Sequence, residues 1–350
     1  MRHAAVAGLF VLLCLVPVIP LRLPGVFDTP LRAPGSLQIL ALCFVFGGVA
    51  LSYDLLFGYT GLLSFGHALF FATGAYATNI ALSRWGWPLG PAVALAAAAG
   101  LVLPLAVGAV ALRVSGIAFA MVTLAFAQAG AIMAFSDPGR LTGGEEGLGL
   151  AVTRLPEFLV GVVNTRYLYW LALGYATAAA AAVWWLSNSR PGRIWQAIRE
   201  NELRAEVLGA RPYPQKLMSF VAGGFLAALG GVVYVFIVGG TAPGITTANL
   251  SLALLVMVVL GGAGSLWGAI VGGALYEYLD LRLVALAGSP QVAGLPAWLR
   301  VPLGQPLFIL GALFILFVVF FPGGIAAIPE RVRVARARRV NPAAVAGGSA

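Results

Sequence analysis

Long runs of apolar residues constrain this chain more than any other feature of its sequence. A helix needs about 20 mostly apolar residues to cross the hydrocarbon core of a bilayer. Such runs fill most of the 350 residues, of which 61% are hydrophobic and 9% are charged, whereas a soluble domain carries about 25% charged residues. A chain this apolar cannot cover its surface with polar groups, so we expect lipid to solvate it.

The runs predict an all-α, polytopic integral membrane protein with about ten transmembrane segments, some of them broken or re-entrant. The run over 249–285 is too long for one span, because its 37 residues would extend about 55 Å as a helix and the hydrocarbon core is about 30 Å thick. Four glycines in its LGGAGSLWG stretch predict a break. The expected segments are 4–20, 36–57, 62–82, 88–112, 115–135, 167–186, 217–240, 249–262, 266–285 and 305–321.

Basic residues are concentrated in two places, and this predicts the orientation of the chain in the membrane. The 187–216 loop has six lysines and arginines and the stretch 331–340 has five, an excess that is typical of cytoplasmic loops. An even number of segments must then separate the two, as the split of 249–285 provides. We expect both termini in the cytoplasm, the 136–166 loop outside, an uncleaved first segment, and a basic, disordered tail over 331–350.

The residues that chemistry on this chain would need are missing. The only lysine, Lys216, follows RPYPQ rather than the glycine-rich turn of a P-loop, so ATP hydrolysis is not predicted. His3 and His67 are the only histidines, which argues against a metal cluster and against a Ser-His-Asp site. No segment carries a charge clearly at its centre, which argues against a self-powered carrier. We therefore predict a protein that is not an enzyme and holds no metal or cofactor.

The formal net charge of +9 does not indicate a nucleic-acid partner. The positive charge lies in loops and in the tail, where membrane topology and anionic lipid headgroups account for it. No basic groove with interleaved aromatic residues is evident in the sequence. The partner expected from composition is therefore the lipid bilayer.

The stretch from Ser189 to Lys216 holds nine of the 33 charged residues of the chain. Pro191 and Gly192 predict a turn, and a single amphipathic helix is expected from there to Gly209. Opposite charges at 199 and 202, and at 200 and 204, are spaced to pair along such a helix. Helices that lie on a membrane favour a polar face rich in lysine and arginine, whereas this one mixes in three glutamates, so a protein groove suits it better. The apolar face comprises Ile194, Ala197, Ile198, Ala205 and Leu208.

This stretch, with the helix after it, resembles the cytoplasmic coupling loop of the branched-chain amino acid ABC transporter permeases. Other stretches resemble motifs of the same family in the expected order. They are GYTGLLSFGHALFFATGAYATNIAL (58–82), TLAFAQ (123–128) with LTGGEEGLGL (141–150), and LGGAGSLWGAIVGGAL (260–275). The resemblance implies that residues 1–330 form a transmembrane permease domain in the bacterial inner membrane. It also implies a binding-protein-dependent ABC importer of branched-chain or related amino acids.

The resemblance implies partners as well as a fold. Two cytoplasmic ABC ATPase subunits would supply the energy, a second related permease would complete a heterodimer, and an extracytoplasmic substrate-binding protein would deliver the solute. Arg204 departs from the family pattern, in which a small residue is expected. The residues that the resemblance assigns to ATPase contact are Arg193, Ala197, Ile198, Glu200, Asn201, Glu202, Ala205, Glu206 and Gly209.

Two further sets of residues are candidates for contact with the solute and with the binding protein. Glycines around the SFGHALFFATGAY stretch permit a broken helix along a translocation path, although a packing motif in which His67 bonds a neighbouring carbonyl is the alternative. The path candidates are Ser64, His67, Asn79, Thr123 and Gln128. The docking candidates in the outer loop are Gly143, Gly144, Glu145 and Glu146, for which solvated loop acids are the alternative.

The solute itself stays open at this point. Permeases of the same architecture import urea, amides and other small carboxylates, and the sequence does not separate these from amino acids. A secondary transporter or channel is the alternative from a different class. It would work without an ATPase, and the lack of a charge clearly at the centre of any segment argues against it.

Overall fold

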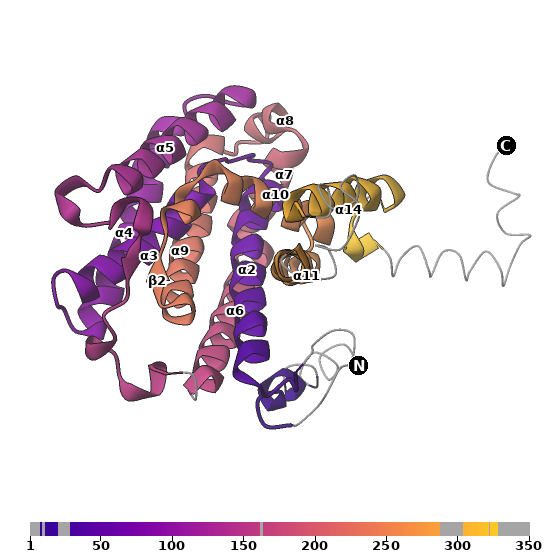
Figure 1. Cartoon of the computed structure of the whole chain (residues 1–350). Coiled ribbons are helices and arrows are strands. Elements are labelled where there is room, and N and C mark those ends of the chain that lie inside the picture. The colour runs from indigo at the N-terminus through magenta and orange to yellow at the C-terminus, as the bar shows by residue number, and fades with distance from the viewer. Residues whose placement is uncertain are drawn as a thin grey trace, which may run out of the picture.

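The computed structural model describes residues 8, 11–19, 29–161, 164–287, 304–321 and 323–327. These residues form a bundle of helices with α2 near its centre (Figure 1). The longer elements are α2 (Pro34–Asp54) with the π-helix η1 (Leu55–Thr60), α3 (His67–Ser83), α4 (Leu89–Ala111), α5 (Ile117–Ser136), α6 (Thr165–Asn188), α7 (Arg190–Glu200), α8 (Glu202–Val207), α9 (Pro212–Val238), α10 (Ala248–Gly261), α11 (Leu266–Ala287) and α14 (Pro306–Phe320).

Short elements occupy the connections. They are the 3-10 turns η2 (Pro138–Arg140), η3 (Gly144–Glu146), η4 (Val152–Arg154), η5 (Glu157–Leu159), η7 (Pro243–Thr246) and η8 (Ile325–Ala327), and the strands β1 (Leu148–Gly149) and β2 (Gly240–Thr241). The two strands pair antiparallel, Leu148 with Thr241 and Gly149 with Gly240. This pairing ties the connection between α5 and α6 to the end of α9.

Every segment predicted between residues 36 and 321 has a helix at its place, and the long apolar run is split as expected. In that run α10 ends at Gly261 and α11 begins at Leu266. Among the described residues, six helices are long and apolar enough to cross a membrane. Most of the predicted first segment, 4–20, and the whole tail over 331–350 lie outside the described residues.

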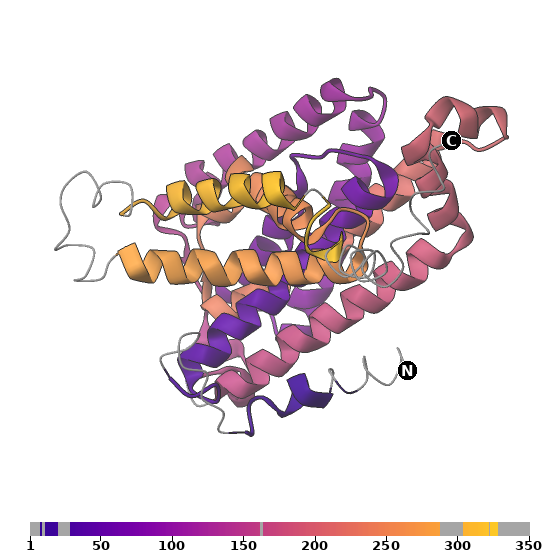
Figure 2. The same cartoon turned by 90° about the vertical axis from the view of Figure 1, so that its right-hand side faces the viewer.

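Contacts define two ends of the bundle. At the β end, Gln38 of α2 donates to the carbonyl of Ile237, next to β2. At the α7 end, the turn between α10 and α11 lies against Arg199 of α7 at Gly264 and against Ala326 of η8 at Gly262. The end of α14 therefore lies at the same end as α7, as an even number of intervening segments requires. Figure 2 shows α7 and α8 projecting from the rest of the bundle.

Burial distinguishes the centre of the bundle from its periphery. The most apolar window of α2 with η1 is 83% buried, whereas that of α14 is 12% buried among the described residues. A helix that is apolar on all sides is stable either inside a bundle or against lipid. Helices cross closely at the centre of the bundle. An added Cβ at Gly231 of α9 would lie only 2.8 Å from the backbone nitrogen of Ala75 in α3. Small residues of this kind let helices pack closely in lipid.

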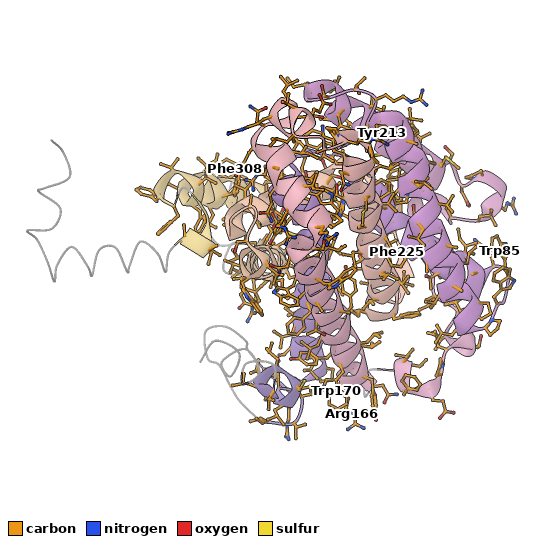
Figure 3. The ribbon with its side chains drawn as sticks, turned by 180° about the vertical axis from the view of Figure 1, so that it is seen from behind. Trp85, Arg166, Trp170, Tyr213, Phe225 and Phe308 are labelled. Carbon is orange, nitrogen blue, oxygen red and sulfur yellow. The ribbon has the colours of Figure 1, made fainter. Side chains whose placement is uncertain are left out.

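Aromatic side chains mark both ends, as is typical of membrane–water interfaces. Trp184 and Trp185 near the α7 end of α6 are 61% and 67% exposed, and Trp85 and Trp87 between α3 and α4 are also exposed. Figure 3 shows Tyr213 in the upper part of the molecule and Trp170 in the lower part. These girdles are consistent with a bundle that crosses the bilayer from the β end to the α7 end.

Candidate functional site: the α7–α8 loop and the break before α3

The charged loop between α6 and α9 folds as two short helices rather than the single helix predicted. The Ser189 hydroxyl accepts a hydrogen bond from the Gly192 backbone at the start of α7 (3.4 Å). Asn201 then leaves the helical region, with φ −160° and ψ 107°, and its side-chain oxygen accepts from the Arg204 backbone nitrogen at 2.9 Å. Asparagine is among the strongest N-cap residues, so Asn201 starts α8 as it ends α7.

The break at Asn201 changes the predicted charge pairs. Glu202 pairs with Lys216 of α9, with Oε1 2.6 Å from Nζ, and Arg199 donates to the backbone carbonyl of Gly58 in η1. The pairs expected along one continuous helix, 199 with 202 and 200 with 204, are therefore wrong for the part of the chain that the structure describes. The physical reason is that the partners stand on two helices with different axes.

An open groove of about 520 Å³ lies between α7 and α8. Its walls are mostly apolar, with two arginines at the rim. Four residues assigned to ATPase contact line it. The lining residues are Arg190, Arg193, Ile194, Ala197, Ala205, Leu208, Gly209 and Ala210.

A second, more polar cavity of about 300 Å³ lies where the end of α7 and the start of α8 meet the bundle. Ile198, predicted on the same face as the groove residues, lies on this side instead and is buried, because α7 turns that face toward its own bundle. Of the residues assigned to ATPase contact, only Glu206 lines neither cavity, and it is exposed. The second cavity is lined by Thr60, Gly61, Leu62, Leu112, Val114, Ser115, Gly116, Ile198, Arg199, Glu200, Asn201, Glu202 and Lys216.

Sequence reasoning missed two large apolar side chains on α8. Leu203 and Val207 are 74% and 88% exposed, and Leu208, which was predicted on the apolar face, is 81% exposed. Leu203 and Val207 would lie on the charged face of one continuous helix that includes Ile194, opposite its apolar face. The signal in the sequence is Asn201 followed by Glu202, a pattern typical of a helix N-terminus. It predicts a second helix whose faces are not in register with those of the first.

The helix that begins at Pro34 stops at Gly61, and α3 begins only at His67. Gly61 has φ +78°, a left-handed conformation that favours glycine and ends a helix. The backbone N–H groups at the start of α3 have no partner within their own helix, and inside a membrane each must find one. Side-chain hydroxyls accept from them: Thr123 from Phe65 (3.1 Å), Ser64 from Gly66 (3.2 Å) and Ser251 from Ala68 (3.0 Å).

His67 is fully buried beside this break. Its Nε2 lies 2.9 Å from the Ser52 hydroxyl, which itself donates to the Val49 carbonyl at 2.7 Å. The hydroxyl therefore accepts from Nε2. The ring stands edge-on to Tyr53, with centroids 5.2 Å apart.

The other path candidates lie elsewhere. Asn79, also buried, donates to the Leu148 carbonyl (2.6 Å) and to the Thr241 hydroxyl (3.0 Å), so it holds both strands to α3. Gln128 is exposed on α5. The structure brings Ser64, His67 and Thr123 together at the break and separates Asn79 and Gln128 from them. A role of these residues in transport stays a prediction.

Comparison with known proteins identifies the chain. The family model described as "Branched-chain amino acid transport system / permease component" matches residues 35–321. The chain belongs to this family. The resemblance predicted from four motifs is confirmed, and so is the all-α, polytopic membrane fold. The match spans the α7–α8 loop, the break before α3 and the 136–166 loop, so each candidate site lies within the permease region.

Curated relatives of the permease carry two kinds of name. The high-affinity branched-chain amino acid transport system permease protein LivM of Escherichia coli K12 is 28% identical over 271 residues, 69% of this chain and 62% of LivM. The autoinducer 2 import system permease protein LsrC of Yersinia pseudotuberculosis serotype O:1b is 32% identical over 198 residues, 55% of this chain and 51% of LsrC. The permease thus spans less than two thirds of the length of either relative.

A solved structure aligns with most of the chain at low similarity. PsaBC from Streptococcus pneumoniae in complex with Fab aligns with a TM-score of 0.41 and 17% identity, over 81% of this permease and 90% of that chain.

The loop with the docking candidates is organised around Asp137 of the permease. Its carboxylate accepts from the Thr142 nitrogen (2.7 Å), the Thr142 hydroxyl (3.0 Å) and the Gly143 nitrogen (3.0 Å). Desolvation raises the pKa of Asp137, but these hydrogen bonds and the charge of Arg84 outweigh it and hold the pKa below its usual value. Glu145 and Glu146 follow in η3 and are exposed.

Proposed function

We propose that this chain is the transmembrane permease subunit of a binding-protein-dependent ABC importer in a bacterial cytoplasmic membrane, and that it carries branched-chain amino acids or related solutes. The observation that carries the proposal is the α7–α8 loop. A charged loop that offers an apolar groove and three exposed apolar side chains at one end of a membrane bundle has the properties of a docking surface for a soluble partner.

The partner that suits this surface is a cytoplasmic ABC ATPase. The sequence has no P-loop of its own, so energy for transport would come from another polypeptide. Leu203, Val207 and Leu208 would enter a cleft of the ATPase, with Arg193 and Glu206 at the polar rim. Closure of two ATPases on ATP would then move α7 and α8, and with them the spans that they join.

The other partners follow from the same proposal. The loop with Gly143, Gly144, Glu145 and Glu146 would meet the binding protein at the β end, and a second related permease would complete the pathway. The name of LivM supports branched-chain amino acids as the solute class. The name of LsrC, an autoinducer 2 import system permease, supports a broader solute range for similar permeases. Urea and amides, which the sequence leaves open as solutes, are assayed beside leucine.

Reconstitution tests the proposal. The permease, its paired permease and the ATPase are placed in liposomes, with the binding protein outside, and uptake of labelled leucine, isoleucine, valine, urea and acetamide is measured with and without ATP inside. We expect uptake of a branched-chain amino acid that needs ATP, the ATPase and the binding protein together. Uptake by the permease alone, driven by an ion gradient, would contradict the proposal and favour a secondary transporter.

A further inference from the structure

The side chain of Arg199, in the last turn of α7, is exposed but contacts the bundle. Its guanidinium donates to the carbonyl of Gly58 in η1. Its stem packs on Gly61, where an added Cβ would lie 3.2 Å from Arg199 Cγ. Its Nη1 also lies against the turn between α10 and α11, where a Cβ on Gly264 would be 2.9 Å away. One side chain of the loop thus contacts two separate segments of the bundle.

These two segments are also joined to each other. The Gly264 nitrogen donates to Oδ1 of Asp54 at 2.8 Å, and Asp54 is fully buried at the end of α2. Its second oxygen has no hydrogen-bond partner among the described residues. Arg199 is a cation whose charge acts on this carboxylate. Asp54, Gly58, Gly264 and Arg199 therefore form one cluster that links α2, η1, α7 and the α10–α11 turn.

The carbonyl that Arg199 binds has a particular position in the fold. Carbonyl groups in the last turn of a helix have no partner in that helix, and the helix dipole is negative there. Gly58 lies in the last turn before Gly61, at which the helix stops. Arg199 therefore caps the end of the α2–η1 helix from outside, just before the chain enters the break that leads into α3.

A cavity of about 300 Å³ lies beside this contact, and Arg199 lines it. Buried Trp195 and Ile198 pack the middle of α7 on the bundle. At the cavity, Arg199 adds the packing of its stem on Gly61 and a polar contact with η1. On the far side of the break, hydroxyls of α5 and α10 hold the start of α3 through Thr123 and Ser251. A shift at Gly58 and Gly61 therefore reaches three spans.

We propose that Arg199 is the positioning residue that transmits a movement of α7 to the break over 61–66 and to the α10–α11 turn. It would thereby couple the state of the ATPase to the opening of the α7 end of the bundle. This inference rests on the proposed function. The groove and the exposed side chains of α8 bind the partner, whereas Arg199 faces the bundle and transmits what the partner does.

The test compares transport with ATP hydrolysis in the reconstituted complex. Arg199→Met removes the charge and the donor at similar length, and Arg199→Lys restores a charged donor. Arg113→Met, at an exposed arginine of the α4–α5 loop at the same end, is the matched control. The readouts are copurification of the ATPase, the rate of ATP hydrolysis, and solute imported per ATP hydrolysed.

We expect Arg199→Met to keep the ATPase bound and active, while solute per ATP falls by about tenfold, a size that one coupling interaction can reach. Arg199→Lys should recover part of the loss, and Arg113→Met should match the unchanged protein. An unchanged ratio in Arg199→Met, or loss of the bound ATPase, would overturn the inference. Absence of ATP-dependent transport in the unchanged complex would instead reject the proposed function, before any variant is compared.

A covalent replacement of the contact gives a second test that does not depend on Arg199→Met. An added Cβ at Gly61 lies 3.5 Å from the Cβ of Arg199, within the range of about 3.5–4.5 Å found in disulfides. With Cys14→Ala and Cys43→Ala as background, Arg199→Cys with Gly61→Cys should transport poorly when reduced and recover on oxidation. Gly61→Cys alone controls for the strained backbone. Oxidation without any recovery would overturn the inference.

Discussion

At the residue scale, Asp137 illustrates how one side chain sets a loop. It ends α5 in a left-handed conformation, with φ 47°, and accepts three hydrogen bonds from Thr142 and Gly143. Each of these bonds favours the ionised carboxylate, which is why its pKa lies below the usual value. The contribution of Asp137 to loop stability is therefore present above the usual pKa of an aspartate, and it is lost as pH falls through the lowered value.

The lowered pKa of Asp137 leads to a prediction for the 136–166 loop. From neutral pH down to pH ~5 the amides of Thr142 and Gly143 should stay protected from hydrogen exchange, and protection should decline only below about pH 4, where a free aspartate titrates. Asp137→Ala should remove the protection at neutral pH. Hydrogen-exchange mass spectrometry of the reconstituted permease measures both, with exposed Glu157→Ala of η5 as the control. A protection that fails near pH 6 would contradict the assignment.

At the scale of elements, the sequence predicts spans well and the loop between them less well. Runs of apolar residues must be about as long as a bilayer is thick, so length and hydropathy suffice to place α2 to α14. The sequence predicts the start of the α3 segment at residue 62, five residues before α3 begins at His67, because residues 61–66 are as apolar as a helix. What ends the helix is the backbone of Gly61, and what stabilises the break is hydroxyls from distant segments, Thr123 and Ser251.

The α7–α8 loop shows the same limit. The sequence predicts its amphipathic character, and the family resemblance assigns Arg193, Ala197, Ala205 and Gly209, which line the groove, to ATPase contact. The break at Asn201 was not, because a cap of about 1 kcal/mol is a weak signal beside strong helical periodicity. Missing it placed Ile198 on the outer face, whereas the structure buries it.

The exposed face of α8 gives a prediction about binding. Val207→Lys with Leu208→Lys should weaken the ATPase complex, because burial of two such side chains is worth about 2 kcal/mol or more, a loss of more than about tenfold in Kd. The fold should persist, since both side chains are largely exposed in the described chain. Copurification of the ATPase and thermal stability in detergent measure the two effects.

Val152→Lys in η4, at the β end, is the matched control. An ATPase that still copurifies with the double variant would exclude α8 as the docking element.

At the scale of the whole molecule, the two ends of the bundle should face different compartments. The excess of lysine and arginine between α6 and α9 predicts that the α7 end is cytoplasmic, and the loop with Glu145 and Glu146 lies at the β end. Glu145 and Glu206 of α8 are both exposed in the structure. A single cysteine at either position, in a background without Cys14 and Cys43, therefore reports on which side of the membrane that position lies.

Labelling with a membrane-impermeant maleimide should modify Glu145→Cys in intact cells and Glu206→Cys only after the membrane is opened. The total amount of each variant purified from the membrane fraction, labelled and unlabelled together, measures how much of it is inserted. Equal labelling of both sites in intact cells, or the reverse order, would show that the predicted orientation is wrong. It would also place α8 out of reach of an ATPase inside the cell.

The break before α3 has a consequence for how this permease can change shape. The groups that accept from Phe65, Gly66 and Ala68 are hydroxyls rather than carbonyls. The oxygen of a serine or threonine changes place by rotation about χ1 while its own backbone stays fixed, so it could follow a backbone N–H that moves or accept from another. If the break bends as we propose, its buried amides would not have to lose all their hydrogen-bond partners at once. The free-energy cost of opening would then be spread over several small steps.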